Sequence, residues 1–183
     1  MLLPARNNQF EFFFAKTFIP DEIEQKYMPY LKRIPGEMFG RCIDFVNYGI
    51  QGFNMQNTQF DVVEQYDRKE PYSRIYRSSY SPERLTSKEF TVTSQLYDGY
   101  VNYFLMLDLF YHYYSSSEDK FISGVPFMRV FDGNGYEVFS IEYVNVLFTG
   151  IDGLDFNYSS NTIDMKTFSC TFRAQEVKIK LAI

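Results

Sequence analysis

The alternation of apolar and polar residues in the last third of the chain predicts consecutive antiparallel strands. Short alternating runs are separated by turn-forming residues, which is typical of strands with one buried and one wet face. The Asp-Gly-Asn-Gly tetrad at 132–135 adopts positive φ at low cost, so we expect it to close a hairpin. The strands predicted here are Phe127–Phe131, Tyr136–Ile141, Tyr143–Phe148, Leu154–Tyr158 and Lys166–Arg173.

The earlier part of the chain contains further segments with strand character. Pro20 ends the first of them, and Asp21 is placed to cap a short helix over Glu22–Tyr30, with Pro29 near its end. This predicts a short helical insertion at 21–32. The strands predicted in this part are Phe10–Phe18, Met38–Tyr48, Phe60–Gln65 and Leu85–Leu96.

Gly99–Ser115 is the segment with the strongest helical pattern, and Asp98 precedes it as a cap. Apolar and aromatic residues occur on nearly all of its sides, so we expect it to pack on the sheet and to be covered on its far side as well. A monomer would expose an aromatic stripe there, whereas an assembly would bury it. Tyr111 and Tyr114 are therefore candidate subunit-interface residues.

Tyr66–Arg84 differs from the predicted strands and helices in its composition. It has five Arg or Lys, four Tyr and two Pro, without a sustained apolar period, which predicts a long loop or extended hairpin that projects from the body. One interpretation is a solvated loop. The other is an interface arm, because protein interfaces are enriched in Tyr and Arg. The candidate contact residues of this arm are Arg68, Tyr72, Arg74, Tyr76 and Arg77.

Bulk composition limits the class of protein. A chain of 183 residues is expected to be a single domain, and its 20% aromatic content, without Trp, favours strands. A net charge of −5 argues against binding nucleic acid through phosphate neutralisation. We expect Cys42 and Cys170 to be small buried hydrophobes, with a disulfide as the alternative. No segment is typical of a transmembrane helix or a signal peptide, which predicts a soluble protein made in a cytoplasm, without a membrane partner.

The chemistry of known active sites is absent from the sequence. His112 is the one histidine, and with two cysteines it makes neither a standard zinc site nor a recognisable catalytic triad. Asp132–Gly135 and Asp152–Asp155 lack the ligand spacing of a calcium loop, and no phosphate-binding glycine motif occurs. Carboxylate pairs such as Glu137 and Glu142 are interpreted as solvated strand faces. We therefore expect no enzyme, no cofactor and no metal.

Three stretches in order carry a resemblance to a known family. They are FTVTSQLYDGYVNYFLMLDLFYHYY at 90–114, FTGIDGLDFNYSSN at 148–161 and TFSCTF at 167–172. This order of strand, aromatic helix, Gly-containing bend and closing strand resembles phage tail tube proteins. The recurrent Asn-Tyr position of that family matches Asn102 and Tyr103, and the resemblance extends loosely to most of the chain.

The resemblance implies a structural subunit of a phage tail. We expect a mainly β, antiparallel β-sandwich or partly closed β-barrel with one packed helix at about 99–115. The family further implies a homo-oligomeric ring, hexameric in expectation, in contact with other tail proteins. Neighbouring sheets would join edge to edge around a lumen through which DNA passes without specific binding, in the virion.

Two features leave the position in the tail open. The helix at 21–32 and the arm at 66–84 depart from the family pattern, so the chain could form the tube itself or a ring that initiates or caps the tube. The alternative from another class is a monomeric β-sandwich module that binds carbohydrate or protein through exposed tyrosines.

Overall fold

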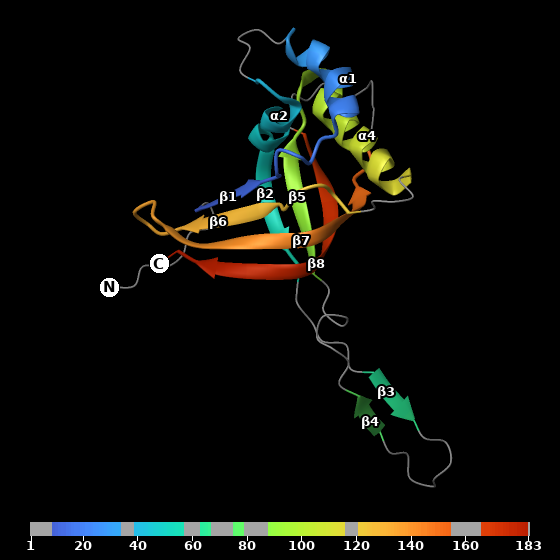
Figure 1. Ribbon diagram of the computed structural model, residues 1–183, viewed down its shortest axis with the longest axis vertical. Coiled ribbons are helices and arrows are strands. Elements are labelled where there is room, and N and C mark those ends of the chain that lie inside the picture. Colours follow the sequence, from blue (N-terminus) through green and yellow to red (C-terminus); the bar gives the residue numbers. More distant parts are fainter. Residues whose placement is uncertain are drawn as a thin grey trace.

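The chain is mainly β, as the sequence predicts. The computed structural model describes residues 9–33, 39–56, 63–66, 75–78, 88–115, 121–154 and 166–182. A six-stranded antiparallel sheet, with the order β1-β6-β7-β8-β5-β2, is nearly closed into a barrel, and β3 and β4 form a separate two-stranded sheet (Figure 1). The strands are β1 (Phe10–Phe13), β2 (Ile50–Met55), β3 (Val63–Tyr66), β4 (Ile75–Ser78), β5 (Glu89–Gln95), β6 (Phe127–Phe131), β7 (Glu137–Ile151) and β8 (Thr167–Leu181).

The helices gather at one end of the barrel, at the top of Figure 1. They are α1 (Asp21–Leu31), α2 (Cys42–Tyr48), the 3-10 turn η1 (Asp98–Tyr100) and α4 (Val101–Ser115). The predicted helices over Glu22–Tyr30 and Gly99–Ser115 are therefore confirmed. Gly99 has a φ of 74°, a left-handed conformation that glycine adopts without strain, and it lies in the middle of the 3-10 turn that precedes the regular helix.

The hairpin predicted at 132–135 is confirmed between β6 and β7. The Asp132 carboxylate accepts hydrogen bonds from the backbone N–H groups of Asn134 and Tyr136, at 2.8 and 2.9 Å. Gly135 has a φ of 84°, as a residue in the tight turn requires. The strand predicted at Phe127–Phe131 has the same bounds in the structure.

The prediction of a strand over Met38–Tyr48 is wrong for its larger part, because Cys42–Tyr48 is the helix α2. The buried residues Cys42, Ile43, Phe45 and Val46 recur at the spacing of one helical face, a pattern that overlaps with alternation in so short a run. Asp44 also accepts a hydrogen bond from the backbone N–H of Arg41, as a residue in the first helical turn does.

Other strand bounds differ from the predicted ones. The two strands predicted at Tyr136–Ile141 and Tyr143–Phe148 are one strand, β7, which begins at Glu137 and leaves Tyr136 in the turn. β8 continues beyond Arg173 to Leu181. The first strand ends at Phe13, and the backbone then turns, with Phe18 N–H donating to the carbonyl of Ala15. Leu154 is outside any strand, whereas 155–158, 57–62 and 85–87 lie outside the described residues.

Stacked aromatic side chains fill the barrel. The Phe172 ring lies 4.5 Å from that of Phe148 and 5.3 Å from that of Phe90, measured between centroids. The rings of Phe12 in β1 and Phe53 in β2 stack at 4.8 Å, which brings the two ends of the sheet order together across the core. Each fully buried Phe contributes about 1.5–3 kcal/mol by removing apolar surface from water.

Candidate assembly surfaces

The second half of β8 is paired on one side only. β5 pairs with Thr167–Arg173, while β7 continues to pair with β8 as far as Leu181. Within the described part of the chain, the segment Gln175–Leu181 therefore has an unpaired edge. We call this segment the β8 edge.

Hydrogen bonds show that β8 changes the direction of its backbone groups within this region. The N–H of Ala174 donates to the carbonyl of Lys88, toward β5, whereas the N–H of Ala182 donates to the carbonyl of Val138, toward β7. In a regular strand the N–H groups of alternate residues point to the same side, so those of Ala174 and Ala182 should both point toward β5. They point to opposite sides, so the orientation of the backbone N–H groups must reverse somewhere between these two residues. Beyond the reversal, the N–H groups of Val177, Ile179 and Leu181 point away from β7.

Large apolar side chains are exposed at the β8 edge. Ile179 and Leu181 have exposed fractions of 68% and 69%, although they share a face with the buried Ile141 across β7. Lys178 and Lys180 face the other way and form ion pairs with Glu176 and Glu142. An unpaired strand edge with exposed branched side chains is a template for pairing with another chain.

Strand β1 lies at the other side of the part of the sheet formed by β6, β7 and the second half of β8. It pairs with β6 through four residues, from Phe10 opposite Val130 to Phe13 opposite Phe127, and it is the terminal strand of the sheet order. The strands β1, β6, β7 and the second half of β8 thus form a four-stranded section, and among the described residues no strand pairs with its edge on either side. The sequence pattern does not predict this section, because alternation of apolar and polar residues ends the predicted strand at Arg173, whereas β8 continues to Leu181.

The structure places the predicted interface residues Tyr111 and Tyr114 on the outer side of α4. Their exposed fractions are 58% and 75%, and the half-buried Phe110 ring contacts both of theirs. Phe104 is also exposed on this helix and was not among the predicted residues. Its spacing of seven residues from Tyr111 is the signal that could have identified it.

Helix α1 packs beside α4 and is joined to it by the half-buried carboxylate of Asp108. Asp108 accepts hydrogen bonds from Lys26 Nζ and from the Tyr27 hydroxyl, the latter at 2.6 Å. Burial opposes ionisation of Asp108, but the hydrogen bonds from Lys26 and Tyr27 outweigh it and lower the pKa of this carboxyl. Burial, together with the nearby Asp108, raises the pKa of Tyr27.

The predicted arm contains an antiparallel hairpin. Val63–Tyr66 pairs with Ile75–Ser78, and Figure 1 shows these two strands away from the barrel. Tyr76 and Arg77 lie in β4. The other predicted arm contacts, Arg68, Tyr72 and Arg74, lie outside the described residues, so the contact role of all five stays a prediction.

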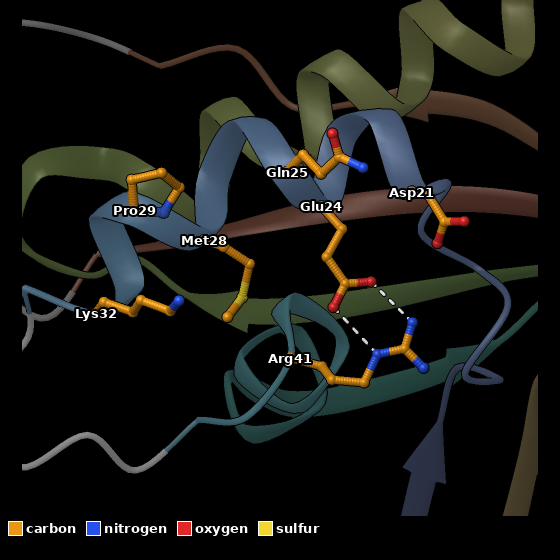
Figure 2. A pocket seen from close by; sticks show the side chains of 7 residues that line it. All are labelled: Asp21, Glu24, Gln25, Met28, Pro29, Lys32 and Arg41. Carbon is orange, nitrogen blue, oxygen red and sulfur yellow. Dashed lines mark hydrogen bonds and ion pairs between the residues drawn. The ribbon is translucent and has the colours of Figure 1, made fainter.

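A shallow groove of about 660 Å³ lies between α1 and the start of α2 (Figure 2). Arg41 crosses it and donates two hydrogen bonds to the Glu24 carboxylate, at 3.1 and 2.8 Å. Hydrogen bonding by Arg41 lowers the pKa of Glu24. This ion pair links α1 to the start of α2, and the charged residues Asp21 and Lys32 also line the groove.

Cys42 and Cys170 are buried free thiols, and burial raises the pKa of both, that of Cys42 to about 11, which disfavours the reactive thiolate. Among the described residues no group of His, Cys, Asp and Glu is arranged to hold a metal ion. None of the helices in that part of the chain is long and apolar enough to cross a membrane.

Comparison with solved structures defines the fold as the tail-tube type. The cap that terminates the tube of the anti-feeding prophage matches 100% of this chain and 94% of its own, with a TM-score of 0.54 and 11% identity. A component of the anti-feeding prophage baseplate matches 98% of this chain and 97% of its own, with a TM-score of 0.50 and 12% identity. The sheath-tube complex of an extracellular contractile injection system matches with a TM-score of 0.43. Neither a protein-family model nor a curated protein sequence matches the chain.

Proposed function

We propose that this protein is a structural subunit of a phage-tail-like injection apparatus and that it assembles into a ring by pairing of strand edges. The observation that carries the proposal is the β8 edge. It combines outward N–H groups with the exposed side chains of Ile179 and Leu181, and the four-stranded section that it bounds ends in β1 on the other side.

The even number of strands in this section supports edge-to-edge closure. Its strands alternate in direction, so β1 and β8 run antiparallel. When rotation about a ring axis places β1 of one copy beside β8 of the next, their antiparallel relation is retained. Such a heterologous contact closes if the rotation divides a full turn. We propose a homo-oligomeric ring, with six copies as the expectation.

The comparisons support a position at an end of the tube. Two structures with TM-scores of at least 0.50 are described as a tube-terminating cap and a baseplate, and each aligns over nearly its whole length. We propose a capping or baseplate-proximal ring in a tail-like particle, in contact with other tail proteins and without a catalytic role. Passage of DNA through the lumen is part of this proposal, although the net charge of −5 offers the DNA no general attraction.

The experiment that tests ring formation removes one backbone donor from the β8 edge. Ile179→Pro deletes an N–H that points away from β7, so the β7–β8 pairing is kept, as is typical of proline on edge strands. We expect the wild-type protein to form rings with a central hole in negative stain and a corresponding mass in native mass spectrometry. The Ile179→Pro variant should form no rings while its circular dichroism spectrum is unchanged.

The matched control is Ile179→Val, which keeps both the donor and a branched side chain and should form rings. Rings of unchanged mass in the Ile179→Pro variant would exclude the β8 edge as the ring contact. A wild-type protein that remains monomeric at every concentration and with tail partners present would contradict the proposed function and favour a monomeric carbohydrate- or protein-binding module.

A further inference from the structure

The outer side of α4 carries an apolar seam with the spacing of a coiled coil. Phe104, Leu107, Tyr111 and Tyr114 follow one another at intervals of three, four and three residues, and all four are exposed or half-exposed. A 3.5-residue repeat is the pattern that packs against another helix. Asp108 and His112 are the ionisable residues of α4 besides its tyrosines, and Lys26 and Tyr27 already bind Asp108.

Helix α1 extends this seam. The two helices run antiparallel, because Tyr30 near the end of α1 lines a groove with Val101 and Phe104 at the start of α4, while Lys26 meets Asp108 further along. The groove has a volume of about 260 Å³. Tyr30 is exposed at its rim, and the Arg33 guanidinium lies 5.7 Å from the centre of the Tyr30 ring.

The charges beside the seam are separated along α1. Glu22, Lys26 and Tyr30 belong to one stripe of α1, because they are spaced at four residues. Arg33 follows two residues after the end of α1, in a turn in which its backbone N–H donates to the carbonyl of Tyr30. Glu22 is exposed and forms no ion pair among the described residues. Glu22 lies in the first turn of α1 and Arg33 just beyond its last turn, a separation of eleven positions, or about 16 Å at the rise of a helix. One end of the stripe is therefore acidic and the other end basic.

We propose that the aromatic face, defined as Tyr30, Phe104, Leu107, Tyr111 and Tyr114, binds the same face of a second copy across a two-fold axis with its helices antiparallel. This orientation places Glu22 of each copy opposite Arg33 of the other, which forms two equivalent ion pairs. A parallel arrangement would oppose like charges. The contact is isologous, so it closes at two copies.

The area available makes this a weak contact. Each aromatic side chain buries roughly 150–250 Å² when fully covered, and these residues are partly covered already, so the total falls near the lower limit of specific interfaces, about 1,000–1,200 Å². We therefore expect the dimer to form only at protein concentrations in the micromolar range or above. It uses helices and leaves the strand edges free, so it does not rest on the proposed ring.

The test is a charge swap measured in the Ile179→Pro background, in which the ring contact is removed. Sedimentation equilibrium should show a monomer–dimer equilibrium. Glu22→Arg alone and Arg33→Glu alone should each raise the dissociation constant about tenfold, because two ion pairs become two like-charge pairs. The double variant should restore the original constant, which requires the two residues to face each other between copies.

A second pair of variants tests the seam itself. Tyr111→Ser combined with Tyr114→Ser should abolish dimerisation, whereas Tyr136→Ser, at an equally exposed tyrosine on the β6–β7 turn, should leave it unchanged. A double charge variant as weak as the single variants would overturn the two-fold arrangement. An Ile179→Pro protein that is monomeric at all concentrations would overturn the proposal, whereas failure of the proposed function would appear separately, as the absence of wild-type rings.

Discussion

Asn145 on β7 donates a hydrogen bond from its side-chain amide to the side-chain carbonyl of Gln175 on β8, over 2.9 Å. Asn145 has a φ of 51°, in the left-handed region that asparagine tolerates better than other residues with a side chain. On β7 the buried positions change from odd to even numbers at this residue, from Ile141 and Tyr143 to Val146 and Phe148. The pair therefore marks the point where the β7–β8 ribbon turns over and the β8 edge begins.

Asn145→Val should destabilise the fold by about 1–2 kcal/mol, because a β-branched residue is strained at positive φ. Asn145→Gly should stay within about 0.5 kcal/mol of the wild type, since glycine adopts this conformation freely. Chemical denaturation measures both. Gln175→Ala, which removes the hydrogen bond without changing the backbone, is the control and should cost no more than about 1 kcal/mol. Equal stability of the Val and Gly variants would mean that the turn does not depend on φ at Asn145.

Tyr143→Phe should stabilise the protein by about 1 kcal/mol. The Tyr143 hydroxyl is buried and has no hydrogen-bond partner among the described residues, and burial raises the pKa of this tyrosine. Removing an unsatisfied polar atom without changing the ring avoids its desolvation penalty. The melting temperature in calorimetry is the readout.

Tyr113→Phe is the matched control for Tyr143. Its hydroxyl donates to the carbonyl of Phe18 at 2.6 Å and accepts the N–H of Ser123 at 3.2 Å. Losing both hydrogen bonds should destabilise the fold by about 1–3 kcal/mol. If both variants lowered the melting temperature alike, Tyr143 would have a partner that this structure does not show.

Asp108 should make the stability of the α1–α4 contact depend on acid pH. Its pKa is lowered in the folded state relative to about 3.9 in an unfolded chain. Its contribution is therefore fully present above the unfolded value and is lost as the pH falls through the folded pKa. Asp108→Asn should reduce stability at pH 7 and flatten the loss of stability below about pH 4.

Glu11→Gln changes an exposed carboxylate on β1 and serves as the control for Asp108. Its unfolding curves should follow the wild type across the same pH range. A steep acid loss that persists in Asp108→Asn would assign the pH dependence to other carboxylates.

Replacing Arg68–Arg77 with a short Gly/Ser turn should leave the barrel folded, because the strands β3 and β4 form a sheet of their own. If the arm contacts a neighbouring copy, ring formation should be lost, and negative-stain imaging measures this. The substitutions Tyr76→Ala and Arg77→Ala then identify the contributions of single residues. An intact ring after truncation would count against the interface arm and favour the solvated loop.

The strand alternation in the sequence determined much of the barrel. Phe168, Cys170 and Phe172 alternate with polar residues, and their side chains are buried on one face of β8 as expected. The aromatic helix was equally readable, because apolar residues on nearly every side favour a helix that packs on the sheet. These features depend on local periodicity, which a sequence carries directly.

Only the tertiary structure decided where the sheet ends and which aromatic residues remain exposed. Residues 42–48 have a pattern that fits either period, and packing against α1, through Arg41 and Glu24, accompanies the helical choice. The odd residues Ile179 and Leu181 look like the core positions of a strand, but β5 stops pairing at Arg173 and leaves their strand with a free edge. Tyr111 and Tyr113 have the same hydropathy, yet Tyr113 is buried and Tyr111 is exposed, because the position of the sheet behind α4 determines which tyrosine is covered. The sequence thus contains the local periods, whereas exposure and free edges arise from contacts between segments far apart in the chain.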